Sequence, residues 1–113
     1  MRITRLLAPA LLAGCSSLSF AQSYVNTPNT IITAAGIFPS AGDYLFLMVS
    51  GTENNKPSCS TNTFPYVIDL STATGTQIMA LVLAARTSQI PIQSISGTGT
   101  CINNAEVVSE ITF

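Results

Sequence analysis

Short runs of apolar residues, some alternating with polar ones, recur along the chain and predict strands over much of its length. Residues 44–49 form a continuous apolar run that is too short for a helix with these flanks, which predicts a strand buried on both faces. Runs rich in β-branched or aromatic residues predict further strands over 30–37 and 64–70.

Two more strands are predicted in the last quarter of the chain. A fourth strand begins at 90–95, where Ile92 and Ile95 have opposite parity and are expected on opposite faces. Residues 106–113 alternate between a mostly apolar and a mostly polar parity, which predicts a final strand with one face in water. The pattern therefore contains five strands.

One helix is predicted over residues 73–87, where Ser71 or Thr72 supplies a hydroxyl that can cap the first turn. An apolar stripe at helical spacing runs through Ile78, Leu81, Val82 and Ala85. Other apolar residues extend around much of the circumference, namely Met79, Leu83 and Ala84. Such a helix is either a central core helix or a core helix whose outer flank also meets a neighbouring subunit, and both satisfy the need for burial.

The elements follow one another as three strands, one helix and two strands, which is an α+β arrangement. This is the succession of the OB-fold, a five-stranded, partly open Greek-key barrel of order β-β-β-α-β-β. Residues 22–29 are polar and contain Pro28. A flexible leader over 22–29 is therefore expected before an OB-like domain over 30–113.

The start of the chain has the pattern of an export signal. Arg2 and Arg5 form a basic beginning, residues 6–12 form an apolar core, and residues 19–21 (Ser-Phe-Ala) form a small-x-small cleavage pattern. Residues 1–21 are therefore expected to be removed as a signal peptide, and the mature protein is expected to be secreted or periplasmic.

A second interpretation of the same segment is a lipoprotein signal. Residues 12–15 (Leu-Ala-Gly-Cys), followed by two serines, resemble the lipobox at which bacterial lipoproteins are cleaved before an acylated cysteine. Acylation at Cys15 would tether the domain to the bacterial envelope, because more than one acyl chain gives lasting membrane association. The apolar stretch continues past Cys15 to the cleavage pattern, which favours simple cleavage after Ala21.

Removal of the signal leaves 92 residues, which suits one small domain. Its cations are Lys56 and Arg86, and its anions are Asp43, Glu53, Asp69, Glu106 and Glu110. The resulting charge of −3 argues against nucleic acid and anionic membranes as partners, since both are bound by clustered cations. No membrane-spanning segment is expected in the mature chain. The low charge beside many apolar residues predicts that sister subunits cover part of the surface, as in a homo-oligomer.

Two cysteines remain after signal removal, Cys59 and Cys101. An even count in an oxidising compartment predicts one disulfide between them. Closing a loop of about 42 residues restricts the unfolded chain by roughly 4 kcal/mol on the loop-entropy model. A metal-binding or redox-active pair is disfavoured, because there is no CxxC spacing and no histidine.

The residue types favour a protein that is not an enzyme and needs no cofactor. The chain has no histidine, and no serine lies in a nucleophile-elbow pattern. Glu106 and Glu110 share a face of the last strand, but a spacing of about 13 Å is too long for a glycosidase pair. They are expected to be solvated charges. Asp69, just before the helix, is expected to support the helix amides and dipole.

Two further groups of residues have both a functional and a structural interpretation. Residues 97–99 (Gly-Thr-Gly) suggest a phosphate loop but lack its helix and lysine, so they are expected to bend the chain tightly and place Cys101. Four aromatic residues can stack on a sugar, although core or interface packing is their more common role. They are Tyr24, Tyr44, Tyr66 and Phe64.

A combination of short motifs resembles the shared core of a group of small, mostly uncharacterised secreted bacterial proteins with a Cys…GTGxC pattern. These motifs are Cys59, residues 66–69 (Tyr-Val-Ile-Asp), Ser71-Thr72, Gly75, residues 81–85, residues 97–101 (Gly-Thr-Gly-Thr-Cys) and Glu106. More distantly, the succession of elements is similar to the B subunits of subtilase-cytotoxin and typhoid-toxin type, which are secreted OB-fold pentamers that bind glycans. The resemblance implies an OB-like domain whose disulfide joins the loop before the third strand to the end of the fourth. Residues 102–105 (Ile-Asn-Asn-Ala) depart from the group, in which an aromatic often follows the second cysteine.

The first functional hypothesis is an exported, non-enzymatic binding module for glycans or for another exported protein, acting as an oligomer and similar to a toxin B subunit. The alternative is an envelope-associated structural protein or lipoprotein, acylated at Cys15, that covers a partner.

Overall fold

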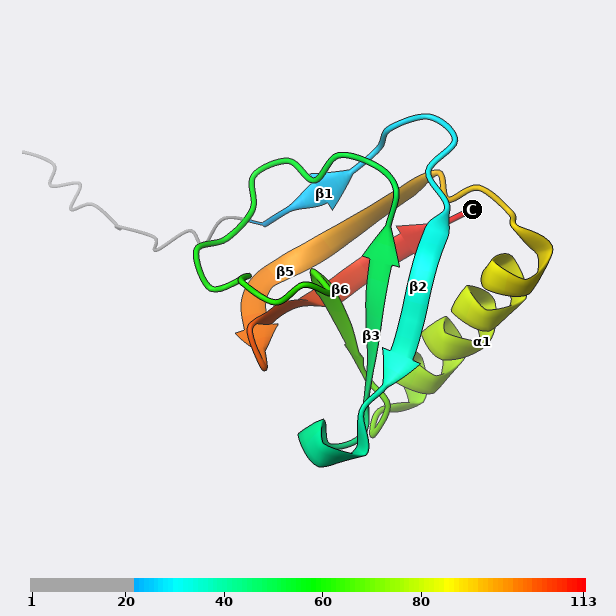
Figure 1. Cartoon of the computed structure of the whole chain (residues 1–113). Coiled ribbons are helices and arrows are strands. Elements are labelled where there is room, and N and C mark those ends of the chain that lie inside the picture. Colours follow the sequence, from blue (N-terminus) through cyan, green and yellow to red (C-terminus); the bar gives the residue numbers. More distant parts are fainter. Residues whose placement is uncertain (1–21) are drawn as a thin grey trace, which may run out of the picture.

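The computed structural model describes residues 22–113 (Figure 1), so the predicted signal peptide and Cys15 lie outside the described residues. This part of the chain forms six strands, one helix and one short 3-10 turn. Their bounds are β1 Tyr24–Val25, β2 Ile32–Ile37, η1 Pro39–Ala41, β3 Tyr44–Val49, β4 Tyr66–Asp69, α1 Ala73–Ser88, β5 Ser94–Ile102 and β6 Ala105–Thr112. The α+β class expected from the sequence is confirmed.

The six strands form one sheet in the order β1-β5-β6-β4-β3-β2. Strands β2, β3 and β4 are an antiparallel meander, β5 and β6 are an antiparallel pair, and β4 runs parallel to β6. The parallel pair requires a long crossover, which α1 and β5 supply. One isolated antiparallel bridge joins Thr30, just before β2, to Ile92, just before β5.

Strand β3 is buried on both of its faces, as its continuous apolar run predicts. Leu45 and Leu47 enter the main core between the sheet and α1. Phe46, of opposite parity, enters a smaller cluster on the other face with Val67 and Ala105. The prediction from the apolar run is confirmed.

The helix begins and ends as the local sequence dictates. The Thr72 hydroxyl accepts a hydrogen bond of 2.9 Å from the Gly75 amide, so Thr72 is the N-cap residue. Gly75 allows close packing, because a Cβ there would lie 1.8 Å from the Asp69 carbonyl oxygen. At the other end Gln89 adopts the left-handed conformation typical of a helix terminus. Within residues 22–113, no helix is long and apolar enough to cross a membrane.

The helix packs against β4 and β2, and Figure 1 shows it lying beside β2. Its buried residues form one stripe along the helix. Gly75, Val82 and Ala85 are buried. Leu81 was expected in this stripe but is 51% exposed, because the inward line passes through Met79 instead. The outer flank of α1 is therefore open in the single chain.

Two segments differ from the sequence-based expectation. Val25, within the expected flexible leader, is 1% exposed and belongs to β1, which pairs with β5. Ile92 and Ile95 were expected on opposite faces, but both are buried in the main core. The parity argument fails there because regular strand pairing begins only at Ser94, so residues 90–93 do not alternate.

Candidate functional site

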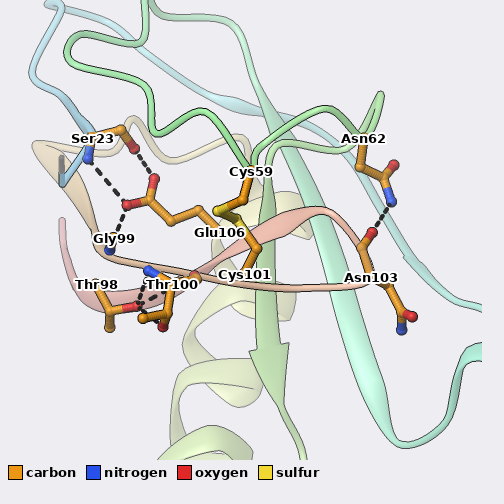
Figure 2. The surroundings of a disulfide bond; sticks show 9 residues. All are labelled: Ser23, Cys59, Asn62, Thr98, Gly99, Thr100, Cys101, Asn103 and Glu106. Atoms are coloured by element: carbon orange, nitrogen blue, oxygen red, sulfur yellow. Dashed lines mark hydrogen bonds between the residues drawn. A yellow bond between two sulfur atoms is a disulfide. The ribbon is translucent and has the colours of Figure 1, made fainter. Parts of the chain in front are cut away.

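Glu106 is the most unusual residue of the fold, because its carboxylate is fully buried. Its Oε2 accepts hydrogen bonds from the Ser23 amide at 3.1 Å and from the Gly99 amide at 2.8 Å, and its Oε1 accepts one from the Ser23 hydroxyl (Figure 2). The expectation that Glu106 is a solvated strand charge is wrong. Glu110 is exposed, as expected.

Irregular pairing explains why two glutamates of the same parity have different environments. Ser96 pairs with Glu110 but Gly97 pairs with Val108, so Ser109 is an extra residue in β6. Because of the extra residue, side chains of the same parity before and after the bulge lie on opposite faces of the sheet. Glu106 therefore points inward, beside its β4 register partner Tyr66.

The glycines of β5 form the cradle for this carboxylate. Between the pairs Gly97–Val108 and Cys101–Glu106, β5 has three residues opposite one. Gly99, with φ of 86°, turns its amide toward Glu106 in this bulge. A Cβ at Gly97 would lie 2.0 Å from Glu106 Cδ. The segment thus does more than bend tightly, because its Gly99 amide also binds the Glu106 side chain.

Tyr66 extends this network. Its side chain is fully buried, and its hydroxyl lies 3.0 Å from the Ser23 hydroxyl. Burial raises the pKa of Tyr66 well above its ordinary value; the hydrogen bond with Ser23 offsets part of this rise, and the nearby negative charges of Glu53 and Glu106 each add a smaller increase. Tyr66 is therefore unavailable for stacking on a ligand, and the network's evident role is to attach the segment around Ser23 to the sheet.

This environment of Tyr66 predicts a loss of stability in alkali. The folded state retains the phenol proton where the unfolded state releases it, so the contribution is complete below about pH 10 and declines as pH rises above it. We expect the free energy of unfolding, measured by urea denaturation, to fall above about pH 10. The decrease in the free energy of unfolding should be smaller in Tyr66→Phe than in the wild type. The control Tyr44→Phe should show the same decrease as the wild type. An equal decline in Tyr66→Phe would contradict this origin.

Asp69 has a local structural role. Its Oδ1 accepts hydrogen bonds from the Ser71 amide at 2.9 Å and the Ser71 hydroxyl at 2.6 Å. These bonds hold the pKa of Asp69 below its usual range. Asp69 thus stabilises the turn that leads into α1, while Thr72 caps the helix itself.

Cys59 and Cys101 form the expected disulfide, with their Cα atoms 6.1 Å apart (Figure 2). The bond joins the loop between β3 and β4 to the end of β5. Cys101 is the register partner of Glu106, so the covalent link and the buried carboxylate lie in the same part of the sheet.

An aromatic cluster lies on the opposite face of the sheet from α1, around Phe46. The ring of Phe38 lies 5.6 Å from that of Phe46 and 5.4 Å from that of Phe64, and Tyr44 lies 6.5 Å from Phe46. Phe38 is 43% exposed while Phe46 is buried beneath it. We call Phe38, Tyr44, Phe46 and Phe64 the aromatic face.

Of the four aromatics considered from the sequence, the structure brings Tyr44 and Phe64 to the aromatic face. Tyr66 lies in the main core, and Tyr24 is 45% exposed on β1 at the other end of the strand order. Sequence reasoning missed Phe38 and Phe46. The available signal for Phe38 was an aromatic at the end of a strand, directly before the turn residue Pro39.

Side-chain amides border the aromatic face. The Asn62 side chain donates a hydrogen bond of 2.9 Å to the Asn103 carbonyl and accepts one of 3.0 Å from the Phe64 amide. The Asn103 side chain donates one of 3.3 Å to the Ala41 carbonyl, in the segment that follows Phe38. Ring faces next to neutral amides are suited to polar ligands with apolar patches.

Comparisons with known proteins add no family assignment: no protein-family model matches the chain, and searches of curated proteins and of solved structures return no match. Among residues 22–113, no group of three or more histidine, cysteine, aspartate or glutamate residues is arranged to hold a metal ion.

Proposed function

We propose that the chain is an exported, non-enzymatic binding module that binds carbohydrate at the aromatic face. The observation that carries the proposal is the half-exposed Phe38 ring, supported from below by Phe46 and from the side by Phe64. An aromatic ring fixed in this way offers a sugar an apolar surface with little loss of side-chain entropy on binding.

We further propose that the sheet closes as an OB-type barrel. The order β5-β6-β4-β3-β2, the parallel pair β4 and β6, and the bridge from Thr30 to Ile92 between the two ends of that series support this topology. In this view β1 is an addition to the five strands expected from the sequence.

The OB assignment gives the aromatic face a functional meaning. OB-folds bind oligonucleotides and oligosaccharides on their second and third strands and in the loops between strands one and two and between strands four and five. These correspond here to β3, β4, residues 38–43 and residues 103–104. Tyr44 and Phe46 on β3, Phe38 in the first loop and Asn103 in the second all belong to or border the aromatic face.

Charge favours sugars over nucleic acids as the ligand. Residues 22–113 carry two cations, Lys56 and Arg86, and five anions. Phosphate backbones need several lysines or arginines for binding. Sugar hydroxyls are instead bound by neutral hydrogen-bonding groups, and aromatic rings can stack on the apolar face of a sugar ring.

The test is a glycan array probed with oxidised wild-type protein and two single-site variants. We expect the wild type to retain at least one class of glycan, Phe38→Ala to lose it, and Tyr24→Ala, which removes an exposed aromatic elsewhere, to keep it. Equal loss in both variants, or no retained glycan with the oxidised wild type, would contradict the proposal.

A second proposal concerns self-association through α1. Leu81 and Leu83, on either side of the buried stripe of the helix, are 51% and 48% exposed, which favours a covering sister subunit over a solvated surface. We expect light scattering at micromolar concentration to give a mass above that of one chain, and a monomer would contradict this.

Mass spectrometry of the N-terminal peptide of the mature protein distinguishes cleavage after Ala21 from acylation at Cys15.

A further inference from the structure

Three loops that are distant in sequence meet at the turn between β5 and β6. The Asn104 carbonyl accepts hydrogen bonds of 2.9 Å from the amides of Thr61 and Asn62, in the loop before β4. The Asn103 carbonyl accepts the bond from the Asn62 side chain (Figure 2). On the other side, the Asn103 side chain reaches the Ala41 carbonyl between β2 and β3. Asn103 is thus the residue that connects all three loops.

The contact at Ala41 bears directly on Phe38. The Ala41 amide donates a hydrogen bond of 2.8 Å to the Phe38 carbonyl, so η1 forms one short turn from Phe38 to Ala41. A side chain that holds the Ala41 carbonyl therefore also restricts the backbone that carries the exposed ring. The turn between β5 and β6 also holds Asn62, through the carbonyls of Asn103 and Asn104. Asn62 Oδ1 in turn accepts the hydrogen bond from the Phe64 amide.

We propose that Asn103 is a positioning residue of the ligand site, which holds Phe38 and Phe64 as a fixed pair of rings. The inference rests on the proposed function only in taking the aromatic face as the ligand face. The disulfide supports the arrangement, because Cys101 precedes Asn103 by two residues and Cys59 precedes Asn62 by three.

The turn offers a matched pair of variants. Asn103 and Asn104 both have positive φ, 51° and 63°, as a two-residue hairpin turn requires, and glycine adopts such angles without strain. Asn103→Gly therefore removes the side-chain bond to Ala41 without straining the turn. Asn104→Gly makes the same change next to it but retains the carbonyl that Thr61 and Asn62 use.

The experiment uses tryptophan fluorescence, since the chain has no tryptophan. Phe38→Trp places a single reporter on the aromatic face of the oxidised protein. Adding Asn103→Gly should raise the fraction of molecules in which residues 38–41 have left the turn about two- to tenfold, as expected for the loss of the one hydrogen bond to Ala41. We expect a red-shifted emission and stronger acrylamide quenching. Adding Asn104→Gly should leave both unchanged, and the two melting temperatures should be similar.

Two further measurements separate this inference from the proposed function. Asn103→Asp, which keeps the size and turn preference but loses the donor, should behave like Asn103→Gly. Glycans retained by the wild type should bind Asn103→Gly about two- to tenfold more weakly and Asn104→Gly equally well. Equal quenching in the two glycine variants overturns the positioning role, whatever the array shows. A quenching difference in a protein that retains no glycan upholds the positioning role and overturns the ligand assignment.

Discussion

Replacing Cys59 and Cys101 together by alanine should lower the free energy of unfolding by about 4 kcal/mol, the loop-entropy value for a loop of this length. The bond spans a sequence separation of 42, and it ties the β3–β4 loop to β5. A loss of this size is a large fraction of the stability of a small domain. Urea denaturation of the oxidised wild type and of the double variant measures it.

Reduced wild type is the control for the cysteine variant. With dithiothreitol present, the wild type should unfold at nearly the same urea concentration as the double variant. A double variant within about 1 kcal/mol of the oxidised wild type would show that the disulfide contributes little to this fold.

Replacing Glu106 by alanine should cost roughly 3 to 5 kcal/mol, because three buried donors lose their acceptor. They are the amides of Ser23 and Gly99 and the Ser23 hydroxyl. Glu110→Ala is the matched control on the same strand, and its exposed side chain predicts a change within about 0.5 kcal/mol. Thermal and urea unfolding of both variants test this.

Hydrogen exchange adds a local test of the Glu106 network. In Glu106→Ala the amides of Ser23 and Gly99 should exchange much faster than in the wild type, while amides of α1 should change only with global stability. Equal stability of Glu106→Ala and Glu110→Ala would contradict the structural role of the buried carboxylate.

The elements that could be predicted from sequence are those whose environment is set locally. The apolar run of β3 and the Thr72 cap of α1 each carry their own signal, and the structure has both as expected. Glu106 could not be predicted, because its burial depends on a bulge at Ser109 and on the glycines of the neighbouring strand. Parity along one strand does not report such irregularities in pairing.

The aromatic face has the same limitation on a larger scale. Phe38, Phe46 and Phe64 are far apart in sequence, and the meander β2-β3-β4 brings the ring of Phe38 within 6 Å of the rings of Phe46 and Phe64. Tyr44 and Phe64 were considered as ligand-stacking residues from their type alone. Their separation from Tyr66 into a different cluster depends on which face of the sheet each strand presents.

The most direct test of the binding module is amide chemical-shift mapping. Labelled, oxidised protein is titrated with the glycan that it binds most strongly on the array. The account predicts that the largest shifts fall in residues 38–46, 62–64 and 103–104. Shifts concentrated on α1 or β1, with these three segments unmoved, would contradict it.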